Sequence, residues 1–104
     1  MRASMSEHDL RRRIVGKFLR QSRLHAGLTQ WDVAHHLQYS TAQFISNWER
    51  GVSLPPLDAL PRLATLFGVP GREMIDTMHE YQEQMLKLSK RQLLDVFRQF
   101  SRNA

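Results

Sequence analysis

The chain has 104 residues, a net charge of +5, 41% hydrophobic residues and no cysteine. This length fits one compact domain with an appendage, and the lack of cysteine excludes disulfides and thiolate metal sites. No apolar run is long enough to cross a membrane and the N-terminus lacks the apolar core of a signal peptide, so we expect a cytoplasmic protein.

The basic excess lies at the start of the sequence. Residues 1–27 hold seven basic and two acidic side chains, whereas residues 28–71 hold two basic and three acidic ones. Residues 72–104 are almost balanced, with six basic and five acidic side chains. A basic segment beside a near-neutral fold indicates a polyanionic partner, with nucleic acid as the first candidate, although basic residues also keep small proteins soluble.

The first two predicted elements are helices, because their apolar residues recur at helical spacing. Ser6 followed by Asp9 is typical of a capping box at the start of a helix that ends near residue 27. Thr29 with Asp32 forms a second capping pair. It predicts a short helix that ends near Leu37.

The third predicted helix runs from about Thr41 to Arg50, with Gly51 as its C-cap. Three of its apolar residues belong in a core: Phe44, Ile45 and Trp48. Four others are uncharged hydrogen-bonding residues: Thr41, Gln43, Ser46 and Asn47. Gln43 and Asn47 are four residues apart and share one face, so this helix has a polar surface that is free to contact a partner or only water.

A fourth helix should follow Pro55 and Pro56 and end at residues 68–71. Its predicted inward residues are Leu57, Leu60, Leu63, Ala64 and Phe67. Pro61 lies within this pattern, so we expect it to remove one backbone hydrogen bond and bend the first turn.

Residues 72–104 predict a C-terminal helical extension without Gly or Pro. Its apolar residues follow a heptad-like seam that slips at Ser89-Lys90, which indicates either a stutter or a break into two helices. The predicted dimerisation residues on this seam are Met74, Met78, Tyr81, Met85, Leu88, Leu93 and Phe97. The same residues are also suited to folding back on the core, and the methionines to binding another protein.

The second helix, the turn and the third helix together make a helix-turn-helix. The run LRQSRLHAGLTQWDVAHHLQYSTAQFISNWERGVSLPPLDALPRLATLFGV resembles the phage-repressor and Cro-type, or xenobiotic-response-element-like, helix-turn-helix regulators. The motifs behind this resemblance are GLTQ at residues 27–30, Val33-Ala34, ISNWERG at residues 45–51, and Pro55 with Leu57 and Leu60. The resemblance covers about residues 14–76.

The resemblance implies an all-α, five-helix, lambda-repressor-like DNA-binding core over residues 6–71, followed by the helical extension at residues 72–104. It implies a transcriptional regulator that binds double-stranded DNA without a cofactor, as a repressor dimer on an inverted repeat, in a bacterial cytoplasm at the nucleoid. Two departures bear on the site. Gln38 stands where the family has a turn glycine, and the stretch from Ser40 to Ile45 is one residue longer than usual.

The resemblance also implies the residues that face DNA. By this resemblance the predicted base-reading residues are Thr41, Ala42, Gln43, Ser46 and Asn47. Gln43 and Asn47 are the strongest candidates, because side-chain amides can pair bidentately with adenine. The predicted phosphate contacts are Gln30, Thr29, Arg50, Lys17 and Arg13. Thr41 is also suited to being only an N-cap, and Arg50 to balancing the helix dipole. Glu49 should pair with an arginine of the first helix, Arg20 or Arg23.

Other classes of function have weaker support in the sequence. His35 and His36 point about 100° apart on a helix, so with His25 they make a poor metal site. No nucleophile–base set, phosphate loop or pair of metal-binding carboxylates is present, so we expect neither an enzyme nor a metal protein. Two alternatives remain: an antitoxin whose tail binds a toxin and that regulates its own operon, and a protein-interaction module that has lost DNA binding.

Overall fold

The computed structural model describes residues 5–103, in which every regular element is a helix. The elements are α1 (Glu7–Leu10), the π-helical segment η1 (Arg11–Gly16), α2 (Lys17–His25), α3 (Gln30–His36), α4 (Gln43–Glu49), α5 (Ala59–Phe67) and α6 (Gly71–Asn103). The first three follow one another without a break and form one N-terminal helix. The described chain therefore has five continuous helices, and the all-α, five-helix prediction is confirmed. Arg2 of the basic segment and Ala104 of the extension lie outside the described residues.

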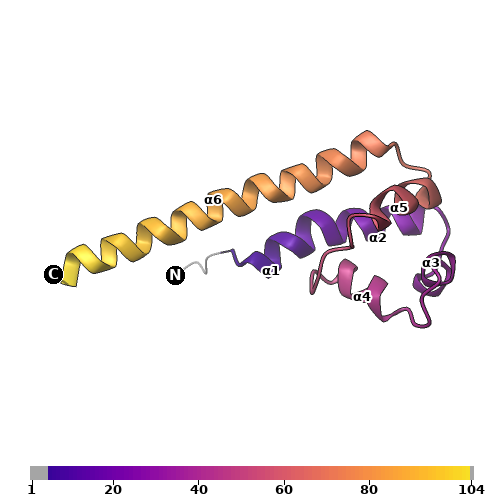
Figure 1. Ribbon diagram of the computed structural model, residues 1–104, viewed down its shortest axis with the longest axis horizontal. Helices are drawn as coiled ribbons and strands as arrows, with labels where there is room; N and C mark the ends of the chain where they lie inside the picture. The colour runs from indigo at the N-terminus through magenta and orange to yellow at the C-terminus, as the bar shows by residue number, and fades with distance from the viewer. Residues whose placement is uncertain (1–4, 104) are drawn as a thin grey trace.

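The N-terminal helix lies between α6 and α4, which contact it from opposite sides (Figure 1). The helices α3 and α5 lie at the end of the bundle where the N-terminal helix ends and α6 begins (Figure 1). The second half of α6 continues past the bundle as a projecting rod (Figure 1). This projection gives the molecule its elongated extents of 56 × 27 × 25 Å.

Both predicted capping boxes are present. The Ser6 hydroxyl accepts the Asp9 N–H at 3.1 Å, and the Thr29 hydroxyl accepts the Asp32 N–H at 3.0 Å. Hydrogen bonds from the Ser6 side chain and backbone lower the pKa of Asp9. Hydrogen bonds from the Thr29 backbone and side chain lower the pKa of Asp32. The start of each helix is therefore fixed by its own local sequence.

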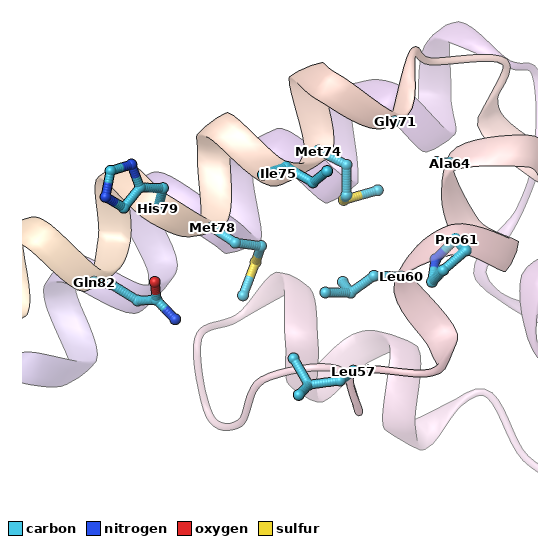
Figure 2. Close-up of a pocket in the computed structure, with 10 residues that line it drawn as sticks. All are labelled: Leu57, Leu60, Pro61, Ala64, Gly71, Met74, Ile75, Met78, His79 and Gln82. Carbon is cyan, nitrogen blue, oxygen red and sulfur yellow. The ribbon is translucent and has the colours of Figure 1, made fainter.

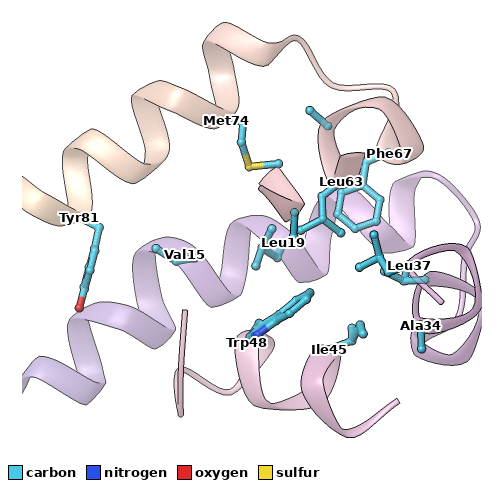
Figure 3. Close-up of a cluster of buried hydrophobic side chains, with 13 residues drawn as sticks. Val15, Leu19, Ala34, Leu37, Ile45, Trp48, Leu63, Phe67, Met74 and Tyr81 are labelled. Atoms are coloured by element: carbon cyan, nitrogen blue, oxygen red, sulfur yellow. The ribbon is translucent and has the colours of Figure 1, made fainter. Parts of the chain in front are cut away.

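The core is built from all five helices (Figure 3). Its buried side chains are Val15, Leu19, Val33, Ala34, Leu37, Ile45, Trp48, Ala59, Leu63, Ala64, Phe67, Met74 and Tyr81. The predicted inward positions of Ile45 and Trp48 are confirmed. The prediction for Phe44 is wrong, because its side chain is half exposed and its ring lies 5.2 Å from that of Tyr39, measured between centroids.

The start of α5 differs from the sequence prediction in two ways. The helix begins at Ala59, so Pro61 lies in its first turn, where backbone N–H groups have no helical partner. Pro61 therefore removes no helical hydrogen bond. Leu57 precedes the helix and is 80% exposed, so its predicted inward position is also wrong. Leu63, Ala64 and Phe67 are buried as expected.

The extension is one unbroken helix through Ser89-Lys90, which excludes the break into two helices. In its first half Met74 and Tyr81 are buried in the core, at 2% and 5% exposure. Met78, Met85 and Leu88 are partly buried. Leu93 and Phe97 are exposed in the projecting half. The predicted seam is thus divided between the chain's own core and open solvent.

Candidate nucleic-acid interface

The connection between α3 and α4 depends on one residue in a left-handed conformation. Gln38, which stands where the resembling family has a turn glycine, has a φ of 63°. The next N–H, of Tyr39, donates to the Ala34 carbonyl at 2.9 Å, which satisfies an end group of α3. A glutamine in this conformation is strained by its Cβ, so the surrounding contacts must hold the turn in place.

The helix α4 begins two residues later than predicted, at Gln43 with Ala42 as the N-cap. The Thr41 hydroxyl accepts the Gln43 N–H at 3.2 Å, so Thr41 helps to start the helix from an exposed position. Ala42 is partly buried and packs against the core. That packing supports a structural role for Ala42 more than the predicted contact with bases.

Four residues of α4 and its C-terminal end form a hydrogen-bonded surface, which we call the α4 polar surface: Gln43, Ser46, Asn47 and Arg50. The Asn47 Oδ1 atom accepts two hydrogen bonds, from Gln43 Nε2 at 2.9 Å and from Arg50 Nη2 at 2.8 Å. Arg50 Nε also donates to the Ser46 hydroxyl at 3.1 Å. Because these side chains hold one another, their rotamers are restricted before any partner arrives.

This arrangement leaves hydrogen-bonding groups pointing outward. Among the described residues, neither the Gln43 carbonyl oxygen nor the Asn47 amide nitrogen takes part in another side-chain hydrogen bond. One is an acceptor and the other a donor, and they come from residues one helical turn apart. Such groups match the donor and acceptor pattern that base pairs present in the major groove, which is wide enough for an α-helix.

The inner side of α4 is held by a buried ion pair. Glu49 accepts Arg23 Nε at 2.6 Å and Arg23 Nη2 at 3.0 Å, and both side chains are buried. Arg23 also donates to the Leu28 carbonyl at 2.8 Å. The prediction that Glu49 pairs with an arginine of the first helix is thereby confirmed for Arg23, while Arg20 is exposed.

Gln30 joins this ion pair to the start of α3. Its Nε2 donates to Glu49 Oε1 at 3.1 Å, so α3, α4 and the N-terminal helix share one polar cluster. No buried side-chain nitrogen or oxygen within residues 5–103 lacks a hydrogen-bond partner. A fully satisfied buried network fixes the orientation of the helices that it joins. The outer surface of α4 is therefore presented in a defined direction.

Sequence reasoning missed the contacts at the C-terminal end of α4. Arg11 Nε donates to the Gly51 carbonyl at 2.7 Å, and the His8 ring lies 3.0 Å from the Arg50 carbonyl oxygen. A Cβ at Gly16 would collide with the Glu49 carbonyl oxygen, so only glycine permits this approach. The sequence holds one indication of the Arg11 contact. Arg11 lies four residues before Val15, so both residues share the apolar face of the N-terminal helix.

The predicted phosphate contacts are in different settings. The Thr29 hydroxyl serves its capping box, and Gln30 binds Glu49. Arg50 belongs to the α4 polar surface, where it donates to Asn47. Arg13 and Lys17 are exposed one turn apart on the N-terminal helix, and neither forms a hydrogen bond with α4. The structure thus gathers Gln30 and Arg50 around α4 but leaves Arg13 and Lys17 on a separate surface.

Two other kinds of feature are absent from residues 5–103. No group of three or more histidine, cysteine or carboxylate side chains is placed to hold a metal ion. No helix in the same range is long and apolar enough to cross a membrane.

Comparisons with known proteins agree with this geometry. Residues 14–77 match the family described as helix-turn-helix domain, and this range includes α3, the turn and α4. No curated protein matches the chain.

Proposed function

Because the chain belongs to the helix-turn-helix domain family, a DNA-binding family, we propose that it is a sequence-specific regulator of transcription. In this proposal α4 enters the major groove of double-stranded DNA. The α4 polar surface contacts the edges of the base pairs. Gln43 and Asn47 carry most of the base recognition, with Ser46 and Thr41 beside them.

The observation that carries this proposal is the hydrogen-bonding of the α4 polar surface. Gln43 and Arg50 are exposed, and Ser46 and Asn47 are partly buried. These side chains are held in place by one another and supported from inside by the buried Arg23–Glu49 pair. An ordinary solvated helix face needs no such restraint, whereas base recognition benefits from it. Restricting a side chain in advance lowers the entropy that binding would otherwise lose.

Phosphate contacts position the protein and give affinity that does not depend on sequence. We assign this role to Arg50, Gln30 and the start of α3 at Thr29, all near α4. Arg13 and Lys17 add general attraction from the basic N-terminal helix, because neutralising phosphates releases counterions and makes binding salt-dependent.

We further propose that the protein acts as a repressor dimer on an inverted repeat, in the cytoplasm of a bacterium. One short recognition helix contacts few base pairs, and two copies separated by one DNA turn roughly add their binding free energies. Residues 6–71 are the DNA reader in this proposal. Residues 72–104 are the dimerisation segment, although α6 itself crosses this boundary.

The test compares alanine variants on two kinds of DNA. Asn47→Ala should lose about 1–3 kcal/mol of binding free energy on the preferred duplex and almost nothing on random duplexes. Gln43→Ala should behave in the same way. The measurement is a fluorescence-anisotropy titration of each duplex at fixed salt concentration.

Arg13→Ala is the matched control. It should weaken binding to both kinds of duplex equally and lower the slope of log affinity against log salt by about one. Equal losses on both duplexes for Asn47→Ala would remove the base-reading role of α4. The remaining interpretation would be a protein-interaction module.

A further inference from the structure

The helix α6 has two apolar stripes rather than one. The first holds Met74, Met78, Tyr81 and Met85 and packs on the chain's own core. The second, which we call the outer stripe, holds Ile75, Leu86, Leu93, Phe97 and Phe100, all of them exposed. At 3.6 residues per turn the two stripes lie about 100° apart around the helix. The outer stripe therefore runs along α6 without facing the core.

An apolar groove borders the start of the outer stripe (Figure 2). It has a volume of about 580 Å³ and lies between the beginning of α5 and the first three turns of α6. Leu57 and Leu60 approach it from one side, and Ile75 and Met78 from the other (Figure 2). Leu57 is 80% exposed and Ile75 is 64% exposed. A continuous exposed apolar surface of this kind marks a contact site.

The distal segment of α6 does not cover this groove in its own chain. The distal segment of α6, residues 86–103, carries most of the outer stripe and projects away from the groove (Figure 1). Because α6 is one continuous helix, its distal segment cannot turn back to its own groove. The same distal segment of a second molecule meets no such restriction.

The charge of α6 is divided in a way that selects this occupant. Residues 71–85 hold one basic and four acidic side chains, whereas residues 86–103 hold five basic and one acidic. Two α6 helices side by side in parallel would place acid against acid and base against base. In an antiparallel pair, the acidic half of each copy lies beside the basic half of the other, which is favourable.

We propose that a second copy of this chain occupies the groove through reciprocal antiparallel pairing of α6. The distal segment of each copy lies in the groove of the other, with Phe100 opposite Ile75 and Phe97 opposite Met78. This register places Asp76 of one copy beside Arg98 of the other, and Glu83 beside Lys90 and Arg91. The pairing adds a dimer interface to the proposed function. It rests on that function only for the effect that the dimer has on DNA binding.

The consequence follows from the symmetry of an antiparallel pair. Its two-fold axis is perpendicular to the plane of the two helices, and the core lies about 100° from the outer stripe, along that axis. Both cores therefore lie on the same side of the pair, and each α4 points away from α6 (Figure 1). In this register equivalent residues near Met78 are about 30 Å apart along the helix direction. That spacing is close to the roughly 34 Å between half-sites one DNA turn apart.

The test uses the absence of cysteine from the chain. Two single, nearly isosteric variants of the full chain, Ser89→Cys and Ser101→Cys, are purified and oxidised. In the proposed register residue 89 lies beside its own equivalent, whereas the two copies of residue 101 are about 40 Å apart. Ser89→Cys should form a disulfide-linked dimer within minutes, and Ser101→Cys should remain unlinked.

A charge-reversal series tests the orientation without cysteine. Sedimentation should give the wild type twice the monomer mass of 12.2 kDa. Asp76→Lys with Glu83→Lys should raise the dimer dissociation constant at least 10-fold. Adding Arg91→Glu and Arg98→Glu to the same chain should restore it, because acid and base have then exchanged places on both helices.

Each other outcome overturns the proposal. Cross-linking at both cysteines, or only at residue 101, would indicate a parallel pair. A monomeric wild type would assign the groove to a different protein. The DNA proposal is judged separately: a monomer that still enriches a single half-site from random duplexes reads DNA without this pairing, and a cross-linked dimer that enriches nothing pairs without reading DNA.

Discussion

Two surfaces of this molecule, the α4 polar surface and the outer stripe of α6, differ in how they interact with water. The α4 polar surface is made of side chains that already bind one another, over a buried ion pair that fixes the helix. The outer stripe is made of apolar side chains that are largely exposed to solvent; Phe97, for example, is 68% exposed.

The difference shows what each surface requires of a partner. Exposed polar groups with internal hydrogen bonds are stable in water, so the α4 polar surface needs no bound partner to be stable. Exposed apolar area is unfavourable in water and gains free energy when it is covered. The outer stripe therefore favours a permanent partner, whereas α4 suits one that binds and leaves.

Removing the support under α4 should have the largest effect. Glu49→Ala leaves the Arg23 guanidinium buried without its carboxylate, which should lower the free energy of unfolding by about 3–5 kcal/mol. Chemical denaturation measures this loss. Arg20→Ala, an exposed arginine of the same helix, is the matched control and should change stability by less than about 0.5 kcal/mol. Similar small losses in both variants would show that α4 is held by its apolar residues alone.

Removing the distal part of the outer stripe, with Leu93, Phe97 and Phe100, should have the next largest effect. A chain that stops after Leu88 keeps Tyr81 and Met85 and so should keep its fold and thermal transition. It should become monomeric and bind an inverted repeat about 100-fold more weakly, because the two half-sites are no longer linked. Sedimentation and DNA titration measure the two changes. Unchanged mass would place the dimer contact elsewhere on the molecule.

The capping box of α3 should give the smallest effect, and one that depends on pH. Its hydrogen bonds lower the pKa of Asp32 in the folded state, so the stability that it contributes is present above the ordinary carboxyl pKa and lost as pH falls through the lowered value. Asp32→Asn should therefore be less stable than wild type at neutral pH. The difference should shrink towards about pH 3.

Urea denaturation at the two pH values measures this difference. Asp58→Asn is the control, because Asp58 precedes α5 without making a side-chain capping bond. A stability difference for Asp32→Asn that is independent of pH would contradict the assigned role of the carboxylate.

Local signals predicted much of this fold. The two capping boxes and the burial of Ile45 and Trp48 follow from short sequence patterns. The sequence left two candidate partners for Glu49, Arg20 and Arg23. Helical periodicity favours Arg23, because it lies four residues after the buried Leu19. The capping boxes and the buried positions depend on residues that are close in sequence, which is why the sequence alone predicts them.

The remaining features depend on how the helices pack against one another in three dimensions. Phe44 and Leu57 are apolar residues at apparently inward positions, yet both are exposed. The ring of Phe44 lies near that of Tyr39, and Leu57 lies before the start of α5. The slip at Ser89-Lys90 has a similar origin. A single heptad count merges the stripe that faces the core with the outer stripe, and the slip marks the change from one to the other. The direct base contacts on α4 remain predictions.

The most direct measurement of the central claim is selection of bound duplexes from a random DNA pool, with the full chain at near-physiological salt. We predict enrichment of an inverted repeat whose half-sites lie about 10 base pairs apart, centre to centre. The enrichment should disappear for Asn47→Ala while the protein stays folded. A folded wild-type protein that enriches no sequence would contradict the claim that the α4 polar surface reads base pairs.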